Sequence, residues 1–435
     1  MSVSRGQLNK AYVSAINFLD QRDINPAIID VANDTNFLDT MRLFGRTKVA
    51  KMANYHTWVN TDMFPTITAG VTTGSGSTIV TTALTAGNLF LRPGDLVSLP
   101  NEGVAYVYSL STSSGIDTLT LHSVNTDGLT LVSGNSLQYA GNVVGEESDQ
   151  VTNRNYDVVK YFNLIQAFRE IDSHTDIQGM TPVETTYNGS NLYTMYEHAI
   201  KIQALKASID IAMIQGRQSV SQFGDASPAL VDAAGKPLQT TMGLNQYTTT
   251  YGVAAALATP GTLVTSDMDN LAVSLNAVKA PADYMGYASD AAKRVYDTYF
   301  KNLGSSGLYS GRLNIDGKEI DLTIDGYKYG SRTYELVPMR VFDHPKVLSA
   351  SIKKSIYWIP KGKVPVKGGG AEPRIQIRYL KHGFAAGNEM IGESMSGALA
   401  PTPNGTVNNW AMHWTTYQGL ECLGVQHFVK QTVVA

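Results

Sequence analysis

The stretch MYEHAIKIQALKASIDIAMIQG, residues 195–216, decides the fold of this chain. Its apolar residues recur every three or four positions, namely Met195, Ala199, Ile202, Leu205, Ile209 and Met213, which predicts an amphipathic helix. Glu197 with Lys201 and Lys206 with Asp210 form opposite-charge pairs four residues apart on its other faces. Such a helix would be on the order of 35 Å long. That length suits the backbone of a domain.

The segments on either side of this helix predict strands and shorter helices. Before it, YFNLIQAFREI at residues 161–171, continued by Ser173 and Thr175, predicts one long strand. After it, residues 217–260 predict loops and short elements, because they are rich in Gly, Ser, Thr and Ala. Ser266 with Asp269 resembles a capping box that opens a helix. A buried strand is expected at 282–288 and a helix at 289–303.

Residues 64–145 differ from the rest in composition. They contain 23 Ser and Thr among 82 residues and only five charged residues. Apolar positions alternate, as in Val104-Tyr106-Tyr108-Leu110, between turn signals such as Pro93-Gly94 and Ser133-Gly134. This pattern predicts a small antiparallel β module that is inserted into a larger fold.

Both ends of the chain have recognisable patterns. The first sixty residues show helical spacing, from Leu8 to Leu19, and predict helices on an arm. Near the other end, Asp316-Gly317 between two short apolar runs predicts a hairpin. Segments 410–414, 420–422 and 425–429 alternate as long strands, the last through His427. The predicted fold class is therefore α+β.

Composition excludes several classes of protein. The chain has 435 residues, 43% hydrophobic and 16% charged, with a net charge of -3, so it is neither basic throughout nor an acidic disordered tail. It shows no signal peptide and no run of about 18 apolar residues, so we expect a protein made in the cytosol without a membrane anchor. Cys422 is the one cysteine, which excludes an intrachain disulfide.

Motifs for catalysis or cofactor binding are not found. The segment Gly392 to Gly397 fails the G-x-S-x-G pattern, no phosphate-binding glycine loop is complete, and the eight histidines never pair at helical metal-ligand spacing. We read His427 as a satisfied core or edge histidine. No enzyme activity, cofactor or metal is therefore expected, although distant residues can assemble a site without a local motif.

Basic residues gather in two places. Residues 353–381 carry eight Lys or Arg against Glu372 alone, a local charge of +7 that leaves -10 on the rest of the chain. A smaller cluster follows the N-terminal helices. Either a solvated loop or contact with another copy of the chain or with DNA explains these charges. The candidate residues are Lys353, Lys354, Lys361, Lys363, Lys367, Arg374, Arg378, Lys381, Arg42, Arg46, Lys48 and Lys51.

Three stretches resemble the HK97-like major capsid proteins of tailed double-stranded DNA bacteriophages. The first begins at Leu91-Arg92-Pro93-Gly94 and leads through Gly145-Glu146-Glu147 to the strand at 161–168, like the extended loop of that family. The second is the helix ending Ile209-Asp210-Ile211-Ala212-Met213-Ile214-Gln215-Gly216. The third, residues 414–424, is similar to the family's terminal strand pair.

The resemblance implies an HK97-like α+β fold with a domain order. It implies an N-terminal helical arm (1–62), an extended loop (63–178) carrying the β module (about 64–145), and a peripheral domain with a spine helix (179–260). An axial α/β domain (261–350) and a basic loop with return strands (351–435) follow. No Lys–Asn crosslinking pair is identified, so non-covalent assembly is expected.

The resemblance also implies a function. The chain would self-assemble into hexamers and pentamers of an icosahedral shell around packaged double-stranded DNA, which it contacts non-specifically. Portal, scaffold and auxiliary capsid proteins would be its partners, with no membrane, and its place would be the virion capsid after synthesis in the host cytoplasm. The alternatives are a carbohydrate-binding or adhesive β-rich surface protein and an enzyme with an unmarked site.

Overall fold

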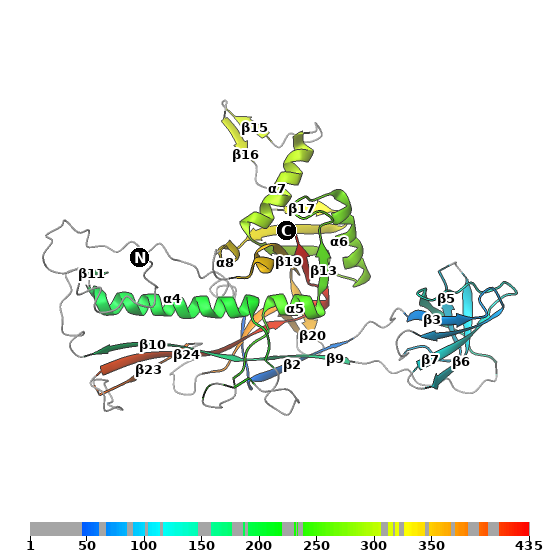
Figure 1. Ribbon diagram of the computed structural model, residues 1–435, viewed down its shortest axis with the longest axis horizontal. Coiled ribbons are helices and arrows are strands. Elements are labelled where there is room, and N and C mark those ends of the chain that lie inside the picture. Colours follow the sequence, from blue (N-terminus) through cyan, green and yellow to red (C-terminus); the bar gives the residue numbers. More distant parts are fainter. Residues whose placement is uncertain are drawn as a thin grey trace. The chain divides into compact units, whose positions relative to one another are not determined.

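The structure is a computed structural model. It describes residues 46–60, 67–84, 90–100, 103–113, 116–146, 158–175, 186–187, 190–219, 230–231, 233, 238–305, 312–315, 318–321, 326–343, 348–366, 370–381, 391–398 and 409–434. The chain divides into two compact units (Figure 1). We call Met1–Tyr55 with Asn163–Ala435 the main unit and His56–Phe162 the barrel unit.

A long helix covers a five-stranded sheet in the main unit. The predicted helix is present as α4 (Leu192–Gln215) and runs along β10 and β24 (Figure 1). The strands of this sheet are β1 (Thr47–Val49), β22 (Ile375–Tyr379), β24 (Asn409–Cys422) and β10 (Gln166–Thr175) in that order, with β23 (Ile391–Ser396) also on β24. Ile209 and Met213 of α4 are fully buried in one cluster with Trp414 and Leu420. The apolar face of the helix therefore supplies the core.

The single long strand predicted over 161–171 is wrong in one respect, because Ile165 divides it. The segment before Ile165 is β9 (Val158–Leu164), which pairs with β2 (Asn54–Asn60), and the segment after it is β10, which pairs antiparallel with β24. Ile165 is 3% exposed and its N–H donates to the carbonyl of Ala53 at 2.8 Å. The chain thus changes its strand partner at a buried residue.

The main unit contains a second sheet, which has six strands. Its order is β13 (Val253–Ala256), β25 (Val429–Thr432), β19 (Ser355–Pro360), β14 (Asp283–Ala288), β18 (Arg332–Pro338) and β17 (Gly326–Tyr329). The strand predicted at 282–288 is confirmed as β14. Trp358 is fully buried against Tyr284 and Tyr334. Gly286 is required there, because a Cβ would lie 2.5 Å from Cζ3 of Trp358.

Helices and short elements complete the main unit. The helix predicted at 289–303 is confirmed as α7 (Asp290–Ser305), and the predicted hairpin is confirmed as β15 (Arg312–Ile315) with β16 (Lys318–Asp321). The remaining elements are α5 (Leu244–Tyr251), α6 (Thr265–Ala277), α8 (Arg340–Asp343), α9 (Ala350–Lys353), β11 (Thr186–Tyr187), β12 (Ser190–Asn191), β20 (Lys363–Val366), β21 (Gly370–Pro373) and the 3₁₀ helix η2 (Val425–His427). Residues 1–45 of the predicted arm lie outside the described residues.

Two local predictions need correction. The helix α6 begins at Thr265, so the carboxylate that caps it belongs to Asp267, which accepts from the Val264 N–H at 3.1 Å, and not to Asp269. His427 lies in η2 rather than on a strand. Gly424, at φ +70°, turns the chain between β24 and η2. An L residue adopts that backbone conformation only with strain.

The barrel unit contains a closed six-stranded barrel, drawn in blue to cyan in Figure 1. Its strands close in the order β3 (Ile67–Thr73), β4 (Ile79–Leu84), β7 (Ile116–Ser123), β6 (Val104–Ser113), β5 (Asp95–Ser98) and β8 (Ser136–Asn142). In β7, Leu119 and Leu121 point into the core while Thr118 and Thr120 are half-buried on the outside. Because the barrel is closed, each of its strands pairs with two neighbours. Hydroxyl side chains such as those of Thr118 and Thr120 lie on its outer face.

Candidate functional site

The predicted basic stretch is mostly regular structure. Residues 353–381 contain the end of α9 and strands β19, β20, β21 and β22, so the description of this stretch as a basic loop is wrong. Its apolar residues explain the difference, since all six residues of β19 are buried. Among the candidate residues, Arg42 and Lys367 lie outside the described residues, Arg374 is buried, Arg46, Lys48, Lys353, Lys354 and Arg378 are half-buried, and Lys51, Lys361, Lys363 and Lys381 are exposed.

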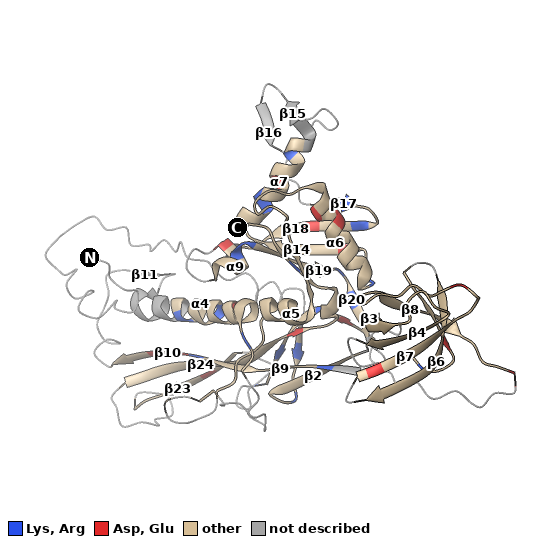
Figure 2. Cartoon of the chain, turned by 45° about the vertical axis from the view of Figure 1, so that its right-hand side comes forward, with Lys and Arg blue, Asp and Glu red and all other residues tan. Residues whose placement is uncertain are grey.

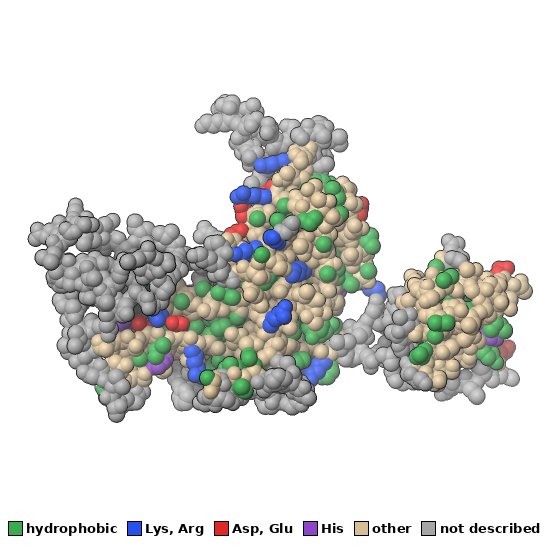
Figure 3. Space-filling view, in the orientation of Figure 1, with side chains coloured by type: hydrophobic (Ala, Val, Ile, Leu, Met, Phe, Trp, Pro, Cys, Tyr) green, Lys and Arg blue, Asp and Glu red, His purple; other side chains and the backbone are tan. Residues whose placement is uncertain are grey.

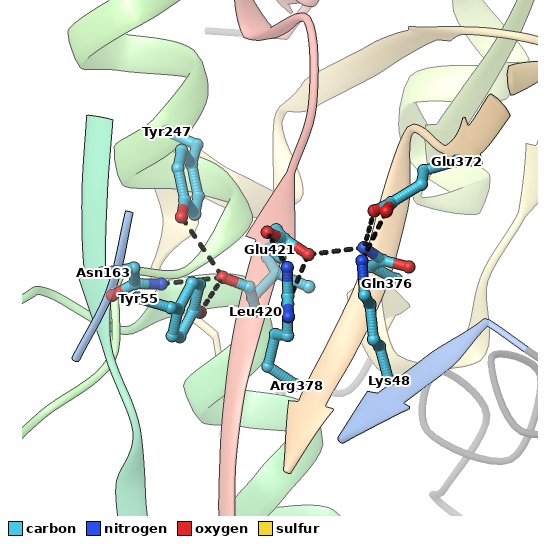
Figure 4. Close-up of polar contacts among 9 residues, drawn as sticks. All are labelled: Lys48, Tyr55, Asn163, Tyr247, Glu372, Gln376, Arg378, Leu420 and Glu421. Atoms are coloured by element: carbon cyan, nitrogen blue, oxygen red, sulfur yellow. Dashed lines mark hydrogen bonds and ion pairs between the residues drawn. The ribbon is translucent and has the colours of Figure 1, made fainter. Parts of the chain in front are cut away.

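Arg378 has a carboxylate partner within the chain. Its Nε lies 2.6 Å from Oε2 of Glu421 and its Nη2 lies 2.7 Å from Oε1, so the planar guanidinium binds the carboxylate at two points (Figure 4). Glu421 is 2% exposed and stands on β24, beside Arg378 on β22. A buried carboxylate would be costly without this partner.

The network continues to β1 and to Glu372 of β21, so with β22 and β24 it joins four strands. Gln376 donates to Glu421 and, at 3.0 Å, to Oε2 of Glu372 (Figure 4). Lys48 of β1 donates to Glu372. The hydrogen bond from Lys48 and that from Gln376 hold the pKa of Glu372 below its usual value, although burial opposes them. Arg378 therefore holds β22 to β24 directly, and Lys48 holds β1 to β22 through Glu372 of β21.

Exposed lysines remain for contacts outside the chain. Lys361 pairs with Glu335, but no pairing of Lys51, Lys363 or Lys381 is recorded within the described residues. Lys51 and Lys381 follow the paired residues Val49 and Tyr379 by two positions each, which places them at the same end of β1 and β22. Lys and Arg residues are spread over the main unit, whereas the strands β3 to β8 of the barrel carry none (Figure 2). In Figure 3 they form no single patch on the visible face.

A single backbone carbonyl joins four elements of the main unit. Leu420 O accepts hydrogen bonds from Asn163 Nδ2 at 2.7 Å, from Tyr247 Oη at 3.2 Å and from Tyr55 Oη (Figure 4). Burial raises the pKa of both tyrosines well above the ordinary value, so their hydroxyls remain protonated donors. β2, β9, α5 and β24 meet at this atom.

Asn163 is the central side chain of this group. It is fully buried, and its Oδ1 accepts from the N–H groups of Met242 and Leu164 at 2.7 Å each. Tyr55 and Asn163 are also the last and first residues of the main unit on either side of the barrel unit. Both points where the chain leaves and re-enters the main unit are thus bound to β24. The sequence analysis missed them, although an Asn within the apolar run 161–165 was a signal.

The site consists of ion pairs and hydrogen bonds between described residues. In the described ranges, no group of three or more His, Cys, Asp or Glu side chains is placed to hold a metal ion. No helix among the described residues is long and apolar enough to cross a membrane. The arrangement stabilises strand order and anchors a long excursion of the chain.

Comparisons with known proteins give the chain its family. The model of the SU10 major capsid protein family matches residues 8–355, which is well over half of the chain. A search among curated proteins found no match. The resemblance to major capsid proteins noted in the sequence is confirmed by the family match.

Solved capsid structures show weak likeness. The structure from Gordonia phage Cozz has 12% identity and a TM-score of 0.42, with 96% of this chain and 92% of that chain covered. The capsid of a native GTA particle has 10% identity and a TM-score of 0.40, covering 98% and 100%. The structure from Microbacterium phage Oxtober96 has 9% identity and a TM-score of 0.40, with 98% of each chain covered. We take no detail of fold or function from such low scores. By its family match, the chain belongs to the SU10 major capsid protein family and is a structural subunit of an icosahedral capsid.

Proposed function

We propose that the chain assembles non-covalently into hexamers and pentamers that tile a shell around packaged double-stranded DNA. The family match over residues 8–355 is the observation that carries this proposal. Open sheet edges and an excursion anchored at Tyr55 and Asn163 support it, because a shell subunit needs surfaces that reach other copies. The role is structural rather than enzymatic.

The domain order of the HK97-like fold belongs to the same proposal. Residues 1–62 would be the arm, and 63–178 the extended loop carrying the module at about 64–145. The peripheral domain at 179–260 would have α4 as its spine helix, and 261–350 would be the axial domain, with residues 351–435 returning through both. The closed barrel within residues 67–142 and the position of α4 on β10 support this order.

Contacts with DNA and with other proteins are also proposed. Lys51, Lys363 and Lys381 are the exposed candidates for non-specific phosphate contact or for pairing with a neighbouring subunit. Portal, scaffold and auxiliary capsid proteins would complete the virion, and the subunit would be made in the host cytoplasm. Replacing Lys51 and Lys381 with Gln should lower DNA retention in shells, while Lys48→Gln, whose charge is paired inside the chain, should change it much less.

Assembly is tested with the purified full-length chain. Light scattering and electron microscopy over a range of ionic strengths should show closed shells. A chain that stays monomeric under every condition, alone and with its genomic neighbours, would contradict the proposed function. Unchanged DNA retention in the double lysine variant would contradict only the proposed role of those lysines.

A further inference from the structure

Two arginines of the main unit are buried without a carboxylate partner. Arg332 is 6% exposed and Arg374 is 9% exposed. Arg332 donates to Asn276 Oδ1 at 2.6 Å and to the carbonyl of Ala280 at 3.3 Å, both of them neutral acceptors. Its Nε has no acceptor, and neither Nε nor Nη1 of Arg374 has one. Within the described residues, neither guanidinium forms an ion pair.

Other polar groups surround Arg374. A Cβ at Gly424 would lie 2.9 Å from Nη1 of Arg374 and 3.9 Å from Nδ1 of His427, so both nitrogens border the same turn. His427 Nδ1 also lacks a hydrogen-bond partner, as does the hydroxyl of Tyr334. Burial and the charge of Arg374 lower the pKa of His427.

Tyr284 connects the two arginines. Its hydroxyl donates to the carbonyl of His427 at 3.0 Å, and its ring stacks on Tyr334 with 5.8 Å between centroids. Burial raises the pKa of Tyr284, while the positive charges of Arg332 and Arg374 oppose that rise. We call Arg332, Arg374, His427, Tyr284 and Tyr334 the arginine cluster.

The free edge of Arg374 indicates the kind of group that is missing. Nε is buried and without an acceptor, and Nη2 beside it forms no hydrogen bond or ion pair with the described residues. Nε and Nη2 form the edge with which Arg378 binds Glu421. A carboxylate that reaches Nη2 and displaces the side chain slightly would therefore be bound at two points, as Glu421 is.

Energetics and charge indicate where that carboxylate comes from. A buried charge without a partner costs several kcal/mol, so native proteins pair such groups. Residues 353–381 have a net charge of +7, and the rest of the chain has a net charge of -10. Every further copy of the chain thus brings a surplus of carboxylates to the shell.

We propose that the arginine cluster is one half of an ion pair between subunits, and that Arg374 receives a carboxylate from a second copy of this chain. The proposal rests on the proposed self-assembly. It implies that the cluster destabilises the free subunit and stabilises the shell. A group with a purely structural role would stabilise both.

The test compares Arg374→Met with Arg378→Met in the full-length chain. For Arg374→Met, the melting temperature of the unassembled subunit should stay the same or rise, while the critical concentration for assembly should rise about tenfold or more. Arg378→Met should lower the melting temperature of the unassembled subunit, because it leaves Glu421 buried without its partner. Arg374→Lys keeps the charge but loses the planar fork, so its critical concentration should lie between those of wild type and Arg374→Met.

Several outcomes would overturn the proposal. If Arg374→Met lowers the stability of the free subunit as much as Arg378→Met does, the arginine is structural. If the critical concentration does not change, no subunit contributes the carboxylate. If inorganic phosphate but not acetate raises the melting temperature of wild type, and Arg374→Met abolishes that rise while assembly is unchanged, the cluster binds a free phosphate. Failure of wild type to assemble would instead contradict the proposed function.

Discussion

The barrel and the main unit differ in one respect: both buried carboxylates of the barrel have partners, whereas the main unit also holds buried arginines with unsatisfied donors. In the barrel, Asp95 accepts hydrogen bonds from Arg92 N–H and Asn142, and Asp117 accepts one from Thr112, so both buried carboxylates have partners within the barrel. In the main unit, Arg374 keeps donors without an acceptor. The barrel closes on itself, whereas both large sheets of the main unit end in edge strands, β13 and β17 in one and β1 and β10 in the other.

This difference indicates that the two units of a shell subunit have different roles in assembly. A closed barrel pairs each of its strands with two neighbours, and its buried carboxylates Asp95 and Asp117 have partners within the barrel. In the main unit the described sheets end in edge strands, and by our proposal the arginine cluster receives a carboxylate from another copy. A substitution in the core of one unit should therefore lower the stability of that unit and leave the other unchanged. The following predictions test this independence.

The largest effect is expected for Trp358→Ala in the main unit. Trp358 is fully buried among Tyr284, Tyr334 and Ile356, so the variant leaves a large cavity. The free energy of unfolding should fall by about 3–5 kcal/mol. Hydrogen exchange measured by mass spectrometry should show the loss in β14, β18 and β19, with the barrel strands unchanged. Val273→Ala, at a 66% exposed position of α6, is the control. A loss of protection that extends equally into the barrel would show that the two regions are coupled.

Leu121→Ala should have the corresponding effect in the barrel. Leu121 is fully buried in the barrel core, and its truncation should cost about 3 kcal/mol. Exchange should increase in β4, β6 and β7 and stay at the wild-type rate in α4 and β24. Val124→Ala, at a 60% exposed position, should leave both regions unchanged. Loss of shell assembly with an intact main unit would mean that the barrel itself contacts other copies.

Asn163→Ala acts at the connection between the two regions. Removal of this buried amide leaves Met242 N–H and the Leu420 carbonyl with fewer partners, and about 2 kcal/mol should be lost. Exchange should increase first at β2, β9 and residues 241–242, while the barrel core keeps its protection. Asn125→Ala on the barrel surface is the control. Wild-type exchange at β2 and β9 would show that the Leu420 carbonyl does not anchor the excursion.

Local patterns predicted much of the fold, and long-range contacts explain what was missed. The spacing of Leu205, Ile209 and Met213 fixed the helix, and alternation in 104–121 indicated the antiparallel module, because both periods depend on near neighbours. Closure of the barrel joins β3 to β8, about seventy residues apart, and no local pattern encodes that. The same reason hid the Leu420 carbonyl and the arginine cluster. Net charge located the basic stretch correctly but could not show that Glu421 neutralises Arg378.

The smallest effect concerns the partly exposed pair of Lys48 and Glu372. Lys48 lowers the pKa of Glu372 in the folded chain from its usual value of 4.5, so the folded state favours the charged carboxylate. The resulting stability is present above pH 4.5 and is lost as the pH falls through the lowered pKa.

Because the pair is partly exposed, Lys48→Met should cost at most about 1 kcal/mol of the free energy of unfolding near neutral pH. Denaturant unfolding at several pH values should show this difference shrinking below pH 4.5, and shrinking also in high salt. Lys51→Met, at an exposed position without a recorded pairing, should show no such dependence. A cost for Lys48→Met that is equal at acidic and neutral pH would mean that the lysine stem packs between the strands, and that its charge contributes nothing to the order of β1 and β22.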